Sequence, residues 1–190
     1  MAVTATFRTS MTSEIPALRA FALSLCGRPD MADDLVQEAL MKAWAASTSF
    51  TEGTNMRAWL FTILRNHFFT ERRKRKREVQ DSEGKYAATL ATYGNQLAHL
   101  DFTDFQTALE KLSDDQREVL VLIGASGFSY EEAAEICNVA VGTIKSRLNR
   151  ARIKLSELLG IKSANDIGPD PNDQAALGGP ARRIGQGGFS

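Results

Sequence analysis

The chain has 190 residues, of which 43% are hydrophobic and 24% are charged. These fractions are typical of a soluble protein with a hydrophobic core, and they exclude wholesale disorder. The 23 basic and 23 acidic residues cancel, so the net charge excludes no class of partner. No run approaches the roughly 18 apolar residues that span a bilayer, and the N-terminus lacks a signal-peptide pattern. We therefore expect a cytoplasmic protein that makes no membrane contact.

The distribution of charge along the chain is more informative than its sum. Residues 71–85 hold seven basic and four acidic groups, residues 101–135 hold nine acidic and two basic groups, and residues 143–157 hold five basic groups and one acidic group. Two basic segments separated by an acidic one are typical of a nucleic-acid-binding protein with acidic surfaces for partners. Ordinary solvated faces would produce the same runs, so this interpretation needs support from motifs.

Helical periodicity dominates, and no alternating strand pattern persists. The periodicity predicts helices at about 12–27, 30–46, 55–80, 104–111, 114–124, 130–137 and 142–160. Ser113 with Gln116, and Ser129 with Glu132, predict capping boxes at two of the helix starts. The fold class is therefore all-α, with two small helical domains at residues 10–80 and 104–162. A flexible linker at 81–103 joins them, and the Gly- and Pro-rich tail at 163–190 is expected to be disordered.

The last predicted helix has one apolar face and one basic face. The core stripe of this helix is Ile144, Leu148, Ala151, Leu155, Leu158 and Leu159. The opposite side carries Lys145, Ser146, Asn149, Arg150 and Ile153, with Arg147 and Arg152 on the flanks. A short helix and a tight turn precede it, which together predict a helix-turn-helix that inserts this helix into the major groove of DNA.

The long helix at 55–80 combines aromatic and basic residues. Its buried stripe is Met56, Trp59, Leu60, Ile63, Leu64, His67 and Phe68, with His67 interpreted as a core histidine. Phe61, Arg65, Phe69 and Arg72 lie on a second face that leads into a basic run ending at Arg77. Rings beside cations suit single-stranded nucleic acid, and plain helix packing explains the same interleaving equally well.

The helix at 30–46 presents Asp34, Gln37, Glu38, Met41 and Lys42 on its outer side. An exposed methionine flanked by carboxylates and an amide favours a protein-docking face over a purely solvated one. The two cysteines, Cys26 and Cys137, lie far apart without CxxC spacing. They predict small buried side chains, with no disulfide, metal site or cofactor.

Together these segments resemble one family, the bacterial sigma factors. Residues 32–44 (ADDLVQEALMKAW) resemble region 2.2, and residues 56–66 (MRAWLFTILRN) with their basic extension resemble regions 2.3 and 2.4. Residues 112–120 (LSDDQREVL), 127–134 (GFSYEEAA) and 142–152 (GTIKSRLNRAR) resemble region 4. The presence of only these two regions is typical of the extracytoplasmic-function (ECF) group. Residues 128–137 and 141–147 look most like its EcfG-type general stress response branch.

The resemblance implies three sets of site residues. The set that docks on the β′ clamp helices of core RNA polymerase is Asp34, Gln37, Glu38 and Met41. The set that captures and melts the −10 element is Phe50, Thr51, Glu52, Asn55, Arg65, Asn66, Arg72 and Arg73, with a loop at 49–55 that receives an extruded base. The set that reads the −35 duplex is Thr143, Lys145, Ser146, Arg147, Asn149 and Arg150.

The resemblance therefore implies a sigma factor that binds core polymerase (β′ clamp helices and β flap) and promoter DNA and starts transcription. It does no covalent chemistry of its own. It also implies inhibition by an anti-sigma factor of the NepR-like kind, which a PhyR-like regulator removes. The alternatives are a sigma-like decoy that binds an anti-sigma factor without DNA and a stand-alone helix-turn-helix repressor. The basic residues argue against a decoy, and the docking face argues against a repressor. An enzyme is disfavoured because the sequence shows no nucleophile–base pair, phosphate loop or metal cluster.

Overall fold

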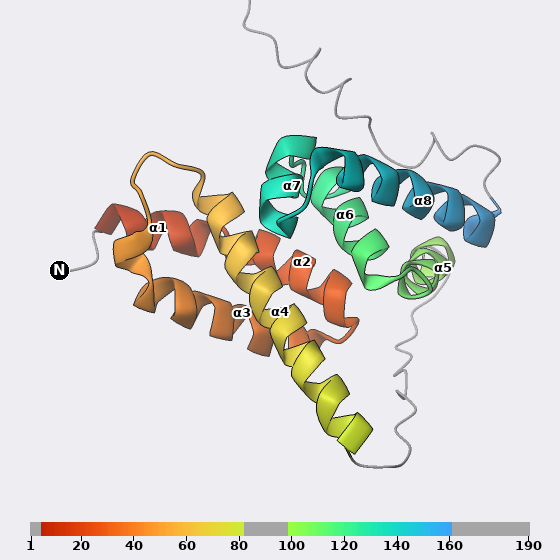
Figure 1. Cartoon of the computed structure of the whole chain (residues 1–190), viewed down its shortest axis with the longest axis horizontal. Helices are drawn as coiled ribbons and strands as arrows, with labels where there is room; N and C mark the ends of the chain where they lie inside the picture. Colours follow the sequence, from red (N-terminus) through yellow and green to blue (C-terminus); the bar gives the residue numbers. More distant parts are fainter. Residues whose placement is uncertain (1–4, 82–98, 161–190) are drawn as a thin grey trace, which may run out of the picture.

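A computed structural model describes residues 5–81 and 99–160 of the chain. These residues form an all-helical structure without strands (Figure 1). The N-terminal helices are α1 (Ala5–Ser13), α2 (Ile15–Cys26), α3 (Pro29–Ala45) and α4 (Met56–Asp81), with a 3₁₀ turn, η1 (Ser47–Ser49), after α3. The C-terminal helices are α5 (His99–Glu110), α6 (Asp114–Gly124), α7 (Tyr130–Cys137) and α8 (Val141–Leu159).

The N-terminal helices form a bundle in which α3 and α4 cover α2. Its fully buried side chains include Leu18, Phe21, Leu60 and Leu64. Gly27 ends α2 with a φ of 72°, and its N–H donates to the carbonyl of Leu23. Glycine adopts this left-handed conformation without the steric cost that a Cβ would add. Pro29 then starts α3, at a position where a missing N–H costs nothing.

The predicted helix at 12–27 is two helices in the structure. The helix is interrupted at Glu14, between α1 and α2, and α1 begins at Ala5, well before residue 12. Phe7 and Met11 lie one helical turn apart, and both are buried against the bundle. Helix α1 escapes prediction because its other residues are small or polar and carry little periodic signal.

The C-terminal helices form a three-helix unit with a fourth helix, α5, packed against α8. Both predicted capping boxes are confirmed: the N–H of Gln116 donates to Ser113 Oγ and the N–H of Glu132 donates to Ser129 Oγ, with the reciprocal bonds also present. Asn138 ends α7 in the left-handed conformation, with a φ of 53°. The short helix, tight turn and long helix of the predicted helix-turn-helix are therefore present as α7 and α8.

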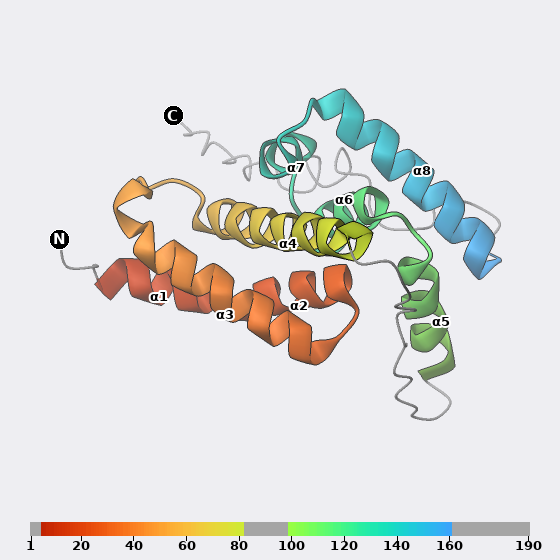
Figure 2. The ribbon, with the colours of Figure 1, turned by 60° about the horizontal axis from the view of Figure 1, so that its bottom comes forward.

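The two sets of helices pack directly against each other. Turned by 60°, the ribbon shows α2 and α3 on one side of α4 and α7 on the other, and α2 also packs directly against α6 (Figure 2). The centre of this contact is a row of rings: Phe21 stacks on Phe61 at 4.8 Å between centroids, and Phe61 meets Phe128 edge-on at 4.9 Å. The guanidinium of Arg57 lies over both Phe61 and Phe128, 5.6 and 5.5 Å from their centroids.

The structure distinguishes the two interpretations of Phe61: it is fully buried between the two sets of helices, so helix packing accounts for it and base stacking does not. One expectation about the faces of α8 is wrong. Leu158, expected on the core stripe of the last helix, is 37% exposed near the end of α8. Helix α5 also begins at His99, inside the range expected to be linker, while most of that range and the whole tail lie outside the described residues.

Candidate nucleic-acid interface

The face of α8 that the sequence predicted to read duplex DNA is exposed. The exposed members of this set are Lys145, Ser146, Asn149 and Arg150, whereas Thr143 and Arg147 are half-buried. Arg150 donates from Nε to the carbonyl of Ser146 at 3.2 Å, which orients its guanidinium along the helix surface. Lys145 lies over the ring of Tyr130, with Nζ 5.3 Å from the centroid. These contacts place Lys145 over the first residue of α7 and hold Arg150 along the surface of α8.

Arg147 differs from the rest of its predicted set. Its guanidinium pairs with Asp115 of α6 at 2.8 Å, and only 20% of its side chain is exposed. This contact joins α6 to α8 within the C-terminal helices. The geometry favours a role in positioning the helix over a direct contact with a base.

One cation of α4 is buried against the C-terminal helices, whereas the basic run at 72–77 is exposed. Arg65 donates from Nε to Glu118 Oε1 at 2.5 Å, with 16% of the Arg65 side chain and none of the Glu118 side chain exposed. Burial raises the pKa of the Glu118 carboxyl, against the lowering effects of Arg65 and of a hydrogen bond from the Cys137 thiol. Burial also raises the pKa of Cys137, to about 12, so the thiol stays protonated and is not a reactive nucleophile.

Two more predicted −10 residues contact the C-terminal helices, but from exposed positions. Arg72 donates to Asp114 Oδ1 at 2.6 Å, at the first residue of α6. Asn55 donates from Nδ2 to Glu132 Oε1 at 2.8 Å, in the first turn of α7. Both pairs join residues far apart in the sequence, and in both the acceptor is a carboxylate on the C-terminal helices.

The remaining −10 residues lie on the surface, with one exception. Thr51, Glu52, Asn66 and Arg73 are exposed. Phe50 is half-buried, and its ring packs against Phe7 and Trp59 at 5.7 and 5.1 Å. It therefore supports the base of the loop at 49–55 rather than projecting from it.

The outer side of α3 is exposed as predicted. Asp34, Gln37, Glu38 and Met41 all face solvent, and 58% of Met41 is accessible. Beside them is an apolar groove of about 460 Å³ whose lining includes Met11, Ile15, Leu40, Met41 and Trp44. Trp44, outside the predicted docking set, is 46% exposed on the same surface. Its position one turn after Met41 on the same helix face would have identified it.

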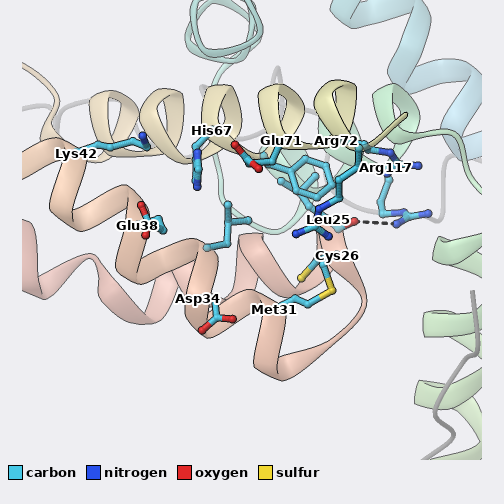
Figure 3. Close-up of a pocket in the computed structure, with 13 residues that line it drawn as sticks. Leu25, Cys26, Met31, Asp34, Glu38, Lys42, His67, Glu71, Arg72 and Arg117 are labelled. Carbon is cyan, nitrogen blue, oxygen red and sulfur yellow. Dashed lines mark hydrogen bonds between the residues drawn. The ribbon is translucent and has the colours of Figure 1, made fainter. Parts of the chain in front are cut away.

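A second groove, of about 780 Å³, separates α3 from α4 and is closed at one end by α6 (Figure 3). Asp34, Glu38 and Lys42 project from α3, and His67, Glu71 and Arg72 face them from α4. At the closed end Arg117 of α6 donates to the carbonyl of Leu25, at the end of α2, at 3.2 Å. His67, expected in the core, is half-buried at the wall of this groove.

The acidic partners of α4 are not among the predicted site residues. Glu118, Asp114 and Glu132 belong to the acidic segment at 101–135, which was noted as a partner-facing surface without being paired to the basic helix. Among the described residues no cluster of His, Cys, Asp or Glu could hold a metal ion. Within 5–81 and 99–160, no helix has the length and apolar character of a membrane span.

Comparisons with known proteins agree on one family. Residues 11–78 match the family described as Sigma-70 region 2, and residues 102–155 match Sigma-70, region 4. The chain is 57% identical to the ECF RNA polymerase sigma factor EcfG of Rhodopseudomonas palustris, over 94% of this chain and 99% of that protein. It is 32% identical to the ECF sigma factor SigM of Bacillus subtilis, over 77% of this chain and 90% of that protein.

Solved structures of sigma factors also match the chain. A co-crystal structure of the sigma factor RpoE with the anti-sigma factor NepR from Bartonella quintana matches with a TM-score of 0.77 and 55% identity. The match covers 84% of this chain and all of that one. The structure of CnrH with the cytosolic domain of CnrY matches with a TM-score of 0.59 and 30% identity, over 83% of this chain and 89% of that one.

Proposed function

The chain belongs to the ECF sigma factors of the sigma-70 family and is similar to EcfG over nearly its whole length. We propose which of its surfaces bind promoter DNA and which bind core polymerase during initiation. As a sigma factor it directs core RNA polymerase to promoters in the cytoplasm and catalyses no reaction itself. The observation that carries the proposal is the pair of cationic helices, α4 and α8, placed on separate units of one chain.

In this proposal α8 reads the −35 duplex. Lys145, Asn149 and Arg150 project from one exposed face of the N-terminal half of α8, the second helix of the helix-turn-helix, where side chains reach base edges in the major groove. Thr143 and Ser146 contribute small hydroxyl groups close to the backbone of the DNA. Arg147 acts through Asp115 as a positioning residue for the helix.

Helix α4 and the loop before it hold the melted −10 strand. The exposed Thr51 and Glu52 and the nearby Asn55 line the loop that admits an extruded base, with Phe50 supporting the loop from below. Arg65, Asn66, Arg72 and Arg73 lie along α4 on the path of the strand. Stacking and phosphate contacts recover about 1–3 kcal/mol per captured base, which offsets the cost of unstacking.

Two protein partners complete the proposal. The exposed face of α3, with Asp34, Gln37, Glu38 and Met41, docks on the β′ clamp helices of core polymerase, and the helix-turn-helix unit contacts the β flap. Trp44 extends the α3 surface toward the apolar groove. Similarity to the RpoE–NepR complex supports inhibition by a NepR-like anti-sigma factor, and similarity to EcfG supports a role in the general stress response.

Transcription reconstituted with purified core polymerase tests the DNA-reading part. The wild-type chain should give defined start sites on a promoter library, and Arg150→Ala should weaken −35-dependent initiation by about 1–3 kcal/mol. Lys154→Ala, which removes an exposed cation from the same helix outside the predicted set, is the matched control. An equal loss for both variants would reduce Arg150 to a general electrostatic contact.

The docking face is tested by the affinity for core polymerase. The double substitution Gln37→Ala and Met41→Ala should weaken this affinity, because it removes an amide and an exposed apolar side chain from the centre of the face. Thr9→Ala removes an exposed side chain of α1 outside the proposed docking surfaces, and it should leave the affinity unchanged. Equal affinities for all three proteins would reject the assignment of this face.

A further inference from the structure

Helix α1 lies beside the loop at 49–55, which is proposed to receive an extruded base of the −10 element (Figure 1). The ring of Phe7 meets the ring of Phe50 edge-on, with 5.7 Å between centroids, and meets the ring of Trp59 edge-on at 6.1 Å. Phe50 and Trp59 are themselves 5.1 Å apart. One ring each from α1, the loop and α4 therefore form a cluster, and Phe7, only 6% exposed, is buried while the other two are half-buried.

Both ends of this loop are fixed, whereas its tip is open. At the first end the ring cluster holds Phe50, whose N–H also donates to the carbonyl of Ser47 at 3.3 Å. At the second end Asn55 Oδ1 accepts from the N–H of Ala58 at 3.1 Å, as a cap at the start of α4. The residues at 51–54 between these ends are exposed. A loop that is already ordered before a base arrives pays less conformational entropy on binding it.

We propose that Phe7 of α1 is a positioning residue for the −10 element: through Phe50, it holds the loop in the shape that accepts one base. The inference rests on the function proposed above. Phe7 acts from beneath the loop and touches no DNA in this role, because its side chain is buried. It also precedes residues 11–78, the segment that matches Sigma-70 region 2. The support comes from outside the matched segment.

The expected consequence is a preference for base identity at one promoter position. A flipped base is recognised through hydrogen bonds to its edge, and these require donors and acceptors at fixed positions. Removal of the Phe7 ring leaves a cavity beside Phe50, so the loop is no longer held in one conformation. The preference for the extruded base should then weaken, while the other promoter positions, which other residues contact, keep their preferences.

The test uses holoenzyme reconstituted from core polymerase and the full-length chain carrying Phe7→Ala, with Leu18→Ala as the matched control. Leu18 is fully buried in α2, so its truncation also leaves a cavity in the N-terminal bundle but takes no ring from the cluster. Affinity is measured for forked promoter DNA that carries each of the four bases at every single-stranded −10 position in turn. Phe7→Ala should reduce the ratio between the best and the worst base about fivefold at one position. Leu18→Ala should leave every ratio at its wild-type value.

A double-mutant cycle determines whether Phe7 acts through Phe50. Phe7→Ala should change the ratio about fivefold in the wild-type background and less than about twofold in the Phe50→Ala background, because residues in contact are not additive. Phe7→Leu, which keeps most of the apolar volume and loses the ring, should shift the ratio in the same direction and replaces Phe7→Ala if circular dichroism shows that variant to be unfolded. Equal effects of Phe7→Ala in the two backgrounds, or equal losses of preference for Phe7→Ala and Leu18→Ala, would overturn the proposal.

Two outcomes separate this inference from the proposed function. Wild-type holoenzyme that binds the forked DNA without preference at any −10 position would reject the proposed role of the loop itself. A wild-type preference that survives both Phe7→Ala and Phe7→Leu would leave the role of the loop standing and reject the role of α1.

Discussion

Arg117 provides the sharpest test of how the two sets of helices are held together. Its guanidinium donates to the carbonyls of Leu109, Glu110 and Leu112 at 2.9, 2.9 and 3.2 Å, and to that of Leu25 at 3.2 Å. Three of these carbonyls lie at and just after the end of α5, and the fourth lies near the end of α2, where helical carbonyls lack intrahelical partners. One side chain thus satisfies acceptors from both units. Burial lowers the pKa of this guanidinium from its usual value.

Arg117→Lys keeps the charge and removes the planar fork. A lysine ammonium has three donors on a single atom and cannot reach carbonyls spread across two helix ends. Hydrogen bonds from a charged group contribute about 1.5–3 kcal/mol when one partner is removed, and one or two would be lost. We therefore expect the free energy of unfolding to fall by about 2–4 kcal/mol.

Urea denaturation followed by circular dichroism measures this loss. Arg19→Lys is the control, because Arg19 also pairs in a bidentate manner, with Asp33, but on the solvent-exposed surface. We expect its denaturation midpoint to match that of the wild type. A loss below about 0.5 kcal/mol for Arg117→Lys, the range of ordinary surface substitutions, would refute the reasoning that Arg117 joins the two units.

Three further predictions concern single positions. Burial raises the pKa of Glu118 in the folded chain, so the wild type loses stability as pH rises through that pKa, whereas Glu118→Gln does not. The stability of the variant relative to the wild type should therefore rise with pH. A difference in thermal unfolding temperature that stays flat or falls with pH would contradict this. Ser129→Ala removes a capping box and should cost about 1 kcal/mol in urea denaturation, with normal cooperativity. Gly27→Ala should lower the free energy of unfolding by about 1–2 kcal/mol, because the φ of Gly27 is 72°. Gly142→Ala, in open space within α8, should be neutral or stabilising. Equal effects of the two substitutions would show that backbone conformation does not decide the difference.

Local periodicity sufficed for most helices and for the faces of α8. Ile144, Leu148, Ala151 and Leu155 are buried as the 3.6-residue repeat predicts, while Lys145 on the opposite side is exposed. The capping boxes were equally accessible to sequence reasoning, because their partners are three residues apart. These features depend on neighbours along the chain, and the sequence contains those neighbours.

The contact between the two units could not be predicted from local sequence. Phe61 and Arg65 lie one turn apart on α4, and this pattern fits base stacking and helix packing equally well. The choice depends on Phe128 and Glu118, which lie more than fifty residues away and reach α4 only through the tertiary fold. Arg147 illustrates the same limit, because its position on the DNA-facing helix gave no sign of its pairing with Asp115.

The polar and apolar parts of this contact have different consequences. Because the side chains of Arg65 and Glu118 are both largely buried, the cost of desolvating them offsets much of their mutual attraction, so this ion pair contributes little to holding the units together. Stability of the contact comes instead from Phe61 and Phe128 and from the carbonyls that Arg117 joins. Of the two arginines of α4 that pair with carboxylates of the C-terminal helices, Arg65 is largely buried and Arg72 stays exposed.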